Sequence, residues 1–249
     1  MTFELPMATI SEQDGIRYLH LGDTPWVQGA FAVRTPNVIV LAYVQRMLAA
    51  LLWRPSEALV PRHAVQLGLG AATLTRFCHG VLRAPRVTAV EINPAVIAAC
   101  RHGFRLPDDD ARLSVVEADA LSWVADAAQR GSVDLLHVDL YDHEAAAPVC
   151  DSERFYADCR ATLAPGGVMA VNLFGRRSSF GASSARIVAA FGRDQVWALR
   201  PTREGNTIVI ATHGVVVPDR AALAVRAATI ERRFGLPART WLRLVRPLE

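Results

Sequence analysis

Lysine is absent from this chain, because all 27 of its Lys and Arg residues are arginine. Without lysine there can be no Schiff-base chemistry, no attachment of pyridoxal phosphate and no lysine-bearing phosphate loop. The arginines are dispersed, with no run longer than the pairs Arg176-Arg177 and Arg232-Arg233, and the net charge is only +3. Nucleic-acid binding requires a basic stripe or cluster, so we expect no nucleic-acid partner.

Cysteine is scarce, and long apolar runs are missing. The four cysteines form no C-x-x-C pair and have no histidines at zinc-ligand spacing, so we predict no metal site. No apolar run reaches the roughly 18 residues that span a bilayer. The first thirteen residues also lack a basic segment followed by an apolar stretch. We therefore expect a cytoplasmic protein that has no membrane partner.

The composition is that of a folded chain with a sizeable core. Its 249 residues are 51% hydrophobic and 20% charged. We predict three parts. Residues 1–55 form an N-terminal β-hairpin and helix, residues 56–215 form a Rossmann-like core, and residues 216–249 form a C-terminal helix and tail.

Short β-branched runs alternate with helical stretches through the central part of the chain. The predicted strands are Ala64–Leu67, Arg86–Val90, Arg112–Val116, Val133–Val138, Val168–Leu173, Gln195–Leu199 and Asn206–Thr212. The predicted helices are Ala71–Val81, Pro94–His102, Asp119–Gln129, Ser152–Leu163 and Ser179–Phe191. Strict alternation implies crossover connections and parallel strands, whereas Arg200–Gly205 is too short for a crossover. The predicted fold is therefore α/β, with a seven-stranded, mostly parallel sheet whose last strand is antiparallel, as in S-adenosylmethionine-dependent Rossmann-like transferases.

The segments on either side of this core are less regular. Ile16–Leu21 and Trp26–Arg34 are predicted to form a short β-hairpin, followed by a helix from Asn37 to Trp53. After the core, Asp219 is predicted to N-cap a helix that ends at Phe234. The tail Gly235–Glu249 receives no assignment.

Three features at successive strand ends predict a nucleotide site. Gly68 and Gly70 follow the first core strand, where glycines let the backbone approach a ligand beside a helix N-terminus. Glu91 ends the second strand, where a carboxylate can accept both ribose hydroxyls. Asp119, followed by Ala120, comes after the third strand, where it can meet an adenine amino group. Taken alone, each feature has a structural alternative: a turn without a ligand, a helix N-cap or a solvated loop charge.

Two details favour an adenosylmethionine-type ligand over NAD. Thr73 stands where a dinucleotide fingerprint requires its third glycine, and a Pro165-Gly166-Gly167 turn precedes the fifth strand.

Two acids, Asp139 and Asp142, follow the fourth strand beside the predicted nucleotide site. A cationic amine would compensate a partly buried Asp139. The alternative is a capping pair in a loop.

In their order along the chain, these residues resemble the spermidine synthase (polyamine aminopropyltransferase) family. That family has a D-x-x-D pair, a loop of small residues and then an aromatic pair that opens a helix. Asp139 and Asp142, Ala145-Ala146-Ala147-Pro148 and Phe155-Tyr156 reproduce this order. The resemblance covers roughly residues 20–212, and the D-x-x-D block is its most specific part.

The resemblance implies an enzyme that transfers an aminopropyl group from decarboxylated S-adenosylmethionine to a diamine such as putrescine, without a prosthetic group. Asp139 would orient and deprotonate the attacking amine, because an ammonium has no lone pair. Asp142, Tyr43 and Tyr141 would bind the acceptor, with Glu144 or Glu204 as further candidates. The donor would be bound by Gln28, Gly68, Gly70, Glu91, Asp119 and Ala120.

The chain also departs from the family pattern. Ala71 stands where the family has an aspartate that grips the donor's ammonium, and Asn172 stands where it has a glutamine. The N-terminal β-domain, which often mediates dimerisation in the family, is abbreviated here, and a homodimer is an expectation from resemblance only. Two other hypotheses therefore stay open: an S-adenosylmethionine-dependent methyltransferase of a small amine, and a non-catalytic protein that binds polyamines or nucleotides.

Overall fold

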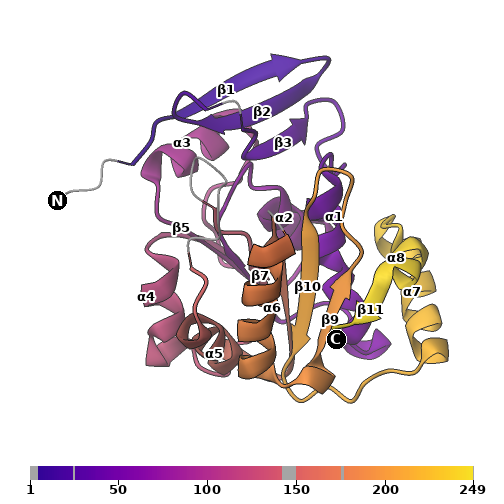
Figure 1. Cartoon of the computed structure of the whole chain (residues 1–249). Helices are drawn as coiled ribbons and strands as arrows, with labels where there is room; N and C mark the ends of the chain where they lie inside the picture. Colours follow the sequence, from indigo (N-terminus) through magenta and orange to yellow (C-terminus); the bar gives the residue numbers. More distant parts are fainter. Residues whose placement is uncertain (1–4, 25, 142–149, 175–176, 249) are drawn as a thin grey trace.

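The structure, a computed structural model, describes residues 5–24, 26–141, 150–174 and 177–248. A large sheet forms its centre, and a small sheet lies at one end of it (Figure 1). The eight strands of the large sheet follow the order β11-β9-β10-β8-β7-β4-β5-β6. In chain order they are β4 (His63–Leu67), β5 (Arg86–Glu91), β6 (Leu113–Glu117), β7 (Val133–Val138), β8 (Leu163–Leu173), β9 (Val196–Leu199), β10 (Thr207–Thr212) and β11 (Val245–Pro247).

Five neighbouring strands of the large sheet are parallel, as predicted. β4 pairs with β5 and β7, β5 pairs with β6, and β7 pairs with β8, all in parallel. β10 is antiparallel to both β8 and β9, which confirms the pairing inferred from the short Arg200–Gly205 connection. β4, β7 and β10 are buried along their whole length, which is why apolar residues predominate in them.

Helices cover both faces of the large sheet (Figure 1). One face packs against α1 (Ala42–Met47), α2 (Thr73–Arg76), α3 (Pro94–Gly103), α7 (Arg220–Phe234) and α8 (Ala238–Leu244). The other face packs against α4 (Ala120–Ala125), α5 (Glu153–Thr162) and α6 (Arg177–Phe191). Alternate residues of a strand face opposite sides of a sheet. Ala64 therefore packs in the hydrophobic core under α1, α2, α3, α7 and α8, and Val65 packs in the core under α4, α5 and α6.

Side-chain caps define several helix starts. Asn93 accepts a hydrogen bond from the Ala95 amide, and Pro94 occupies the first position of α3. The predicted cap of α7 by Asp219 is confirmed, since its carboxylate accepts from the Ala222 amide. Three predicted helices are shorter than expected, and the one predicted over Asp119–Gln129 is α-helical only over Ala120–Ala125. The helix predicted from Asn37 begins at Ala42 and becomes a 3₁₀-helix over Leu48–Trp53, and α2 becomes a π-helix over Phe77–Val81.

The N-terminal part is a three-stranded antiparallel sheet rather than a hairpin. β2 (Ile16–Leu21) and β3 (Gly29–Ala32) pair as predicted, and β1 (Ala8–Gln13) adds a third strand. Five of the six residues of β1 are exposed, so this strand lacks the buried alternating face from which strands are predicted. Its position depends on pairing with β2 through a turn at Asp14-Gly15, where both residues have positive φ.

The C-terminal tail completes the large sheet. α8 and β11 occupy the segment that received no assignment, and β11 pairs antiparallel with β9. The sheet therefore has eight strands rather than the predicted seven. Trp241 of α8 is fully buried, so the tail forms part of the core. Within the described residues, no helix combines the length and hydrophobicity needed to cross a membrane.

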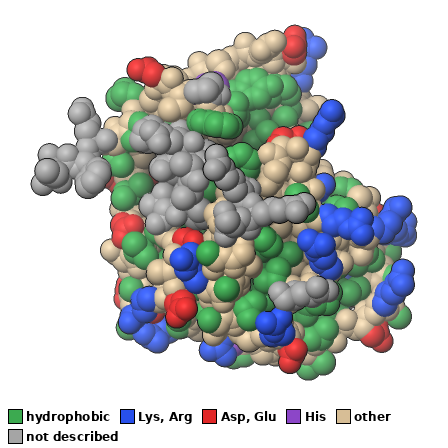
Figure 2. Space-filling view, viewed as in Figure 1, with side chains coloured by type: hydrophobic (Ala, Val, Ile, Leu, Met, Phe, Trp, Pro, Cys, Tyr) green, Lys and Arg blue, Asp and Glu red, His purple; other side chains and the backbone are tan. Residues whose placement is uncertain are grey.

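Arginine side chains are spread over the face shown in Figure 2, separated by hydrophobic and acidic groups. This agrees with their dispersion along the sequence. Many of them bond to backbone carbonyls or ion-pair locally: Arg54, for example, donates to the carbonyl oxygens of Ala58 and Asp134.

Candidate active site

A cavity of about 620 Å³ opens at the carboxyl ends of β4, β5 and β7, beneath the small N-terminal sheet. Nine of the ten predicted site residues line it: Gln28, Tyr43, Gly68, Gly70, Glu91, Asp119, Ala120, Asp139 and Tyr141. The tenth, Asp142, lies outside the described residues, as do Glu144 and the Ala145–Pro148 loop. Carboxyl ends of parallel strands meet at one edge of a sheet, which explains why residues so far apart in sequence converge here.

The glycine loop needs glycine for two reasons. Gly68 and Gly70 have φ values of +88° and +51°, a left-handed region that other residues rarely adopt. A Cβ on Gly68 would also overlap the backbone carbonyl oxygen of Asp139. On Gly70, a Cβ would come within 3.0 Å of the Gln28 carbonyl oxygen. The loop from Gly68 to Gly70 therefore packs between the end of β7 and the start of β3.

Ala71, the residue that departs from the family pattern, is buried against Gly29. A Cβ on Gly29 would lie 2.5 Å from both the Cβ and the amide nitrogen of Ala71. Ala71 is 2% exposed and does not line the main cavity. Ala71 therefore packs directly against the backbone of Gly29, at the start of β3.

Glu91, at the end of β5, ties the glycine loop to the next helix. One carboxylate oxygen accepts from the Leu69 amide at 2.9 Å, and the other accepts from the Asn93 amide at 3.0 Å. Burial raises the pKa of Glu91, while these backbone hydrogen bonds lower it. Each carboxylate oxygen keeps a second lone pair for a ligand, so the side chain can still accept two hydroxyl groups.

Asp119 has the structural role that the sequence left open as an alternative, and its role toward a ligand stays a prediction. It N-caps α4, and its Oδ2 accepts from both the amide and the hydroxyl of Ser122 at 3.0 Å. It also lines the cavity, next to Ala120. Both bonds involve the same oxygen. The other oxygen, Oδ1, has no hydrogen bond to a described residue and can accept one from a ligand.

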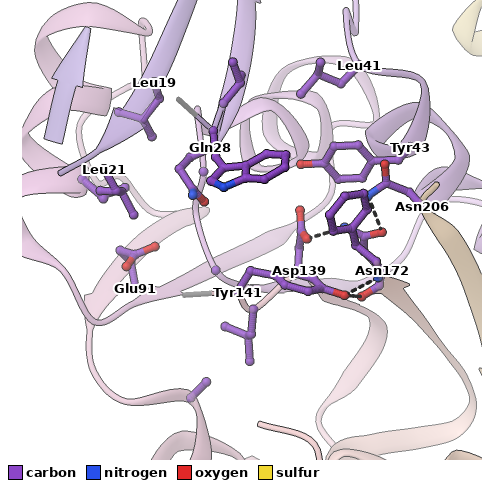
Figure 3. Close-up of a pocket in the computed structure, with 18 of the residues that line it drawn as sticks. Leu19, Leu21, Gln28, Leu41, Tyr43, Glu91, Asp139, Tyr141, Asn172 and Asn206 are labelled. Carbon is purple, nitrogen blue, oxygen red and sulfur yellow. Dashed lines mark hydrogen bonds between the residues drawn. The ribbon is translucent and has the colours of Figure 1, made fainter. Parts of the chain in front are cut away.

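Asp139 lies at the end of β7, on the opposite side of the cavity from Glu91 (Figure 3). Its Oδ1 accepts a hydrogen bond of 2.8 Å from the side-chain amide of Asn172. Burial raises the pKa of Asp139, and hydrogen bonding by Asn172 and the Tyr43 hydroxyl opposes that rise. Burial and the nearby Asp139 charge raise the pKa of Tyr43 well above its usual value, so Tyr43 stays a neutral donor.

The hydroxyl of Tyr141 is occupied by backbone groups. It donates to the Asn172 carbonyl oxygen at 3.1 Å and accepts from the Phe174 amide. Burial raises the pKa of Tyr141, which keeps the hydroxyl protonated. Tyr141 lines the cavity with its hydroxyl engaged by these backbone groups, and its role in binding the acceptor stays a prediction.

Several cavity residues had no predicted role. Phe174 directly follows β8, and its ring packs edge-on against Trp26 at 6.2 Å and Tyr141 at 6.4 Å. Asn206 lies just before β10 and hydrogen-bonds Asn172. The position of Phe174 after a strand that ends at the site edge is the signal that could have identified it. For Asn206 no comparable signal exists, because its place depends on how β10 pairs with β8.

The cavity is lined by acidic side chains and by no basic side chain among the described residues. Among the described lining residues there are four carboxylates, those of Glu91, Asp119, Asp139 and Glu204, and no arginine or histidine. No ion pair recorded between described residues involves any of the four. A cavity of this kind favours a cationic ligand, because uncompensated carboxylates attract positive charge and repel anions.

Comparisons with known proteins agree with this chemistry. The chain is 34% identical over 233 residues to a polyamine aminopropyltransferase of Chromobacterium violaceum, an alignment that covers 93% of this chain and 86% of the relative. No protein-family model matches the chain.

Solved structures share the fold. A probable spermidine synthase from Corynebacterium glutamicum matches with a TM-score of 0.70 at 17% identity, covering 95% of this chain and 88% of that one. Human methyltransferase-like protein 13, solved in complex with SAH, matches with a TM-score of 0.69 at 24% identity, covering 84% and 96%. These matches show that the chain has the Rossmann-like fold that the sequence predicts.

Proposed function

The chain belongs to the polyamine aminopropyltransferase family, and we propose that its cavity transfers an aminopropyl group from decarboxylated S-adenosylmethionine to a diamine. The observation that carries this proposal is the single cavity lined by four carboxylates and by no cationic side chain among the described residues. Both substrates are cations, and both reacting groups have to be held together in that cavity. Positioning alone can supply a large part of the rate enhancement in such a reaction.

The adenosine half of the donor would lie between Glu91 and Asp119. The free lone pairs of Glu91 suit the two ribose hydroxyls, and the free oxygen of Asp119 suits the adenine amino group. Gly68 and Gly70 let the ligand approach the backbone. Gln28, which contacts the glycine loop, would cover the donor from the side of the small sheet.

The reaction itself would occur beside Asp139. The lone pair of the acceptor amine forms a bond to the methylene carbon next to the sulfonium. The carbon–sulfur bond breaks, its electron pair stays on sulfur, and neutral methylthioadenosine leaves. The nitrogen proton passes to Asp139, whose burial raises the pKa of the carboxyl and so makes it a better proton acceptor.

The absence of cationic groups among the described lining residues also favours the decarboxylated donor. Ordinary S-adenosylmethionine carries a carboxylate beside its α-ammonium group, and no described lining side chain is positively charged to pair with that carboxylate. Burying a carboxylate that no protein cation contacts is costly, and the like charge of Asp139 nearby adds to that cost. Loss of the donor carboxylate removes both penalties. Position 71 need not carry an acid for this selection to operate.

The acceptor would extend from Asp139 toward the rim. There Glu204, on the connection between β9 and β10, supplies the remaining carboxylate. Hydrogen bonding to its own amide and to Thr202 lowers the pKa of Glu204, so it is ionised at neutral pH. A diamine could pair one nitrogen with Asp139 and the other with Glu204, while the rings of Trp26, Phe174 and Tyr141 contact its methylene groups. Asp142 remains a sequence-based candidate for the same acceptor.

Product analysis tests this function directly. Purified protein incubated with decarboxylated donor and putrescine should release methylthioadenosine and the aminopropylated amine in equal amounts. Release of S-adenosylhomocysteine from ordinary S-adenosylmethionine, with no methylthioadenosine, would instead show the methyltransferase alternative. Donor binding by calorimetry with neither product would show the non-catalytic alternative.

A further inference from the structure

A chain of three polar side chains leads from Asp139 to the β9–β10 connection. The Asn172 amide group donates to Asp139 Oδ1 at 2.8 Å, and the Asn206 amide group donates to Asn172 Oδ1 at 3.1 Å (Figure 3). At the outer end, Thr202 Oγ1 lies 3.5 Å from Asn206 Oδ1 and accepts from the Asn206 backbone amide at 3.2 Å. Asn172, Asn206 and Thr202 are all buried.

Strand geometry brings these residues together. Asn172 shares the face of β8 that carries Ala170, and Asn206 is two residues before Ile208, which faces the same core. β8 and β10 are antiparallel neighbours in which Asn172 lies opposite Ile208. The two amides thus lie next to each other at the edge of the sheet where β7 ends in Asp139.

The hydrogen bonds can run in only one direction while Asp139 is ionised. A carboxylate accepts and cannot donate, so Asn172 must turn its NH₂ group toward Asp139. Its oxygen then faces Asn206, which must in turn present its own NH₂ group. With Asn206 anchored to Thr202, the orientation of Asn172 is set from both ends.

We propose that Asn206 is a positioning residue that acts on Asp139 through Asn172, holding the Asn172 amide with its NH₂ group toward the carboxylate. This inference rests on the proposed role of Asp139 as the base. Donation by Asn172 stabilises the ionised carboxylate, and burial opposes it. The other titratable side chains facing Asp139 are Tyr43 and Tyr141, and both stay neutral because burial raises the pKa of each. Asn206 thereby keeps the base ready to accept a proton at neutral pH.

A titration of Asp139 in the free protein tests this role without requiring turnover. Carbon-13 NMR of protein labelled at the aspartate carboxyl gives the pKa, and the Asp139 signal is assigned by its loss in Asp139→Asn. Asn172→Leu should raise the pKa of Asp139 by about one unit, because a hydrogen bond to a charged group is lost. Asn206→Leu should raise it in the same direction by a smaller amount.

The double variant decides whether Asn206 acts through Asn172. In the Asn172→Leu background, Asn206→Leu should change the pKa of Asp139 by less than about 0.3 unit. An unchanged pKa in the Asn206→Leu single variant, or an equal shift with and without Asn172, would overturn the proposal. If Asn206→Leu does not fold, Asn206→Asp, which has nearly the same shape, takes its place. The ionised carboxylate introduced by Asn206→Asp can only accept hydrogen bonds, so it should draw the Asn172 NH₂ group away from Asp139. The pKa of Asp139 should then rise more in the presence of Asn172 than in its absence.

A control and a kinetic readout separate positioning from stability and from substrate contact. Thr212→Val removes another buried hydrogen bond, to Gln195 at the far end of β10, and should lower the melting temperature without moving the pKa of Asp139. In the active enzyme, the acid limb of kcat/KM should shift with the NMR pKa in each variant. If no methylthioadenosine forms with wild type, the proposed function fails while the NMR cycle still tests the relay.

Discussion

Gly68 and Asp139 touch through the backbone: a Cβ on residue 68 would overlap the carbonyl oxygen of residue 139. The loop proposed to bind the donor and the residue proposed to activate the acceptor are therefore in direct contact. Any change that moves one moves the other, which suits a reaction in which the two substrates must meet in line.

Gly68→Ala should damage both stability and binding. The positive φ costs about 1–2 kcal/mol for a residue with a Cβ, and the overlap with Asp139 adds to it. We expect a loss of at least about 2 kcal/mol in the free energy of unfolding, measured by chemical denaturation, together with loss of donor binding. Gly181→Ala is the matched control, because Gly181 is helical and has open space around its Cβ position. A Gly68→Ala protein that binds donor normally would contradict this account of the loop.

Glu91→Gln should weaken binding of the adenosine half. Glutamine has one acceptor oxygen and no charge, so it cannot hold the Leu69 and Asn93 amides and still accept both ribose hydroxyls. We expect the affinity for methylthioadenosine, which lacks the aminopropyl group, to fall about tenfold to hundredfold by calorimetry. Glu117 is the register partner of Glu91 on the neighbouring strand and does not line the cavity, so Glu117→Gln should leave that affinity unchanged.

Asp139→Asn should separate activity from stability. Loss of the base should reduce kcat by at least about a hundredfold. Burial raises the pKa of Asp139 above its usual 3.8, so its ionised form destabilises the folded state. The contribution of Asp139 to stability is therefore greatest below its usual pKa and is lost as pH rises through the raised value. Thermal denaturation should show the Asp139→Asn protein gaining stability over wild type on going from acid to neutral pH.

Glu204→Gln should affect one kind of acceptor only. If Glu204 pairs with the second nitrogen, its neutralisation should raise KM for putrescine and leave KM for butylamine, which has one nitrogen, unchanged. We expect an increase of about tenfold for the diamine, the value of one charge-assisted contact. Glu153→Gln, on α5 and away from the cavity, is the control. Equal effects on both amines would remove Glu204 from acceptor recognition.

His137 should make the fold sensitive to acid. Both of its ring nitrogens are buried without a hydrogen-bond partner among the described residues, and burial lowers the pKa of His137 to about 3. In the unfolded chain His137 is protonated below about pH 6.5, whereas in the folded protein it stays neutral. The free energy of unfolding therefore decreases as pH falls below 6.5. The loss is about 1.4 kcal/mol per pH unit. The free energy of unfolding of His137→Leu, measured by denaturation from pH 7 to pH 4, should change less with pH than that of wild type.

Much of this arrangement could be predicted from the sequence. β2 and β7 begin and end at the predicted residues, because their apolar patterns and bounding turns are strong. Gly68, Glu91 and Asp139 could be grouped without coordinates, since residues at the carboxyl ends of parallel strands converge. That reasoning needs only strand order and direction.

The remainder depends on tertiary contacts that no local pattern encodes. β1 is an exposed edge strand and β11 has three residues, so each exists only through its pairing with a neighbour. The Asn172–Asn206 contact arises from the register of β8 against β10, which alternation along one strand does not determine. The occupied hydroxyl of Tyr141 likewise follows from the backbone path after β8.

A competition between two donors tests the central claim, that this acid-lined cavity performs aminopropyl transfer, most directly. Equal concentrations of decarboxylated and ordinary S-adenosylmethionine are supplied together with putrescine, and both nucleoside products are quantified by mass spectrometry. The account predicts methylthioadenosine in large excess, matched by aminopropylated amine and abolished by Asp139→Asn. Predominance of S-adenosylhomocysteine, or a yield of methylthioadenosine unaffected by Asp139→Asn, would contradict it.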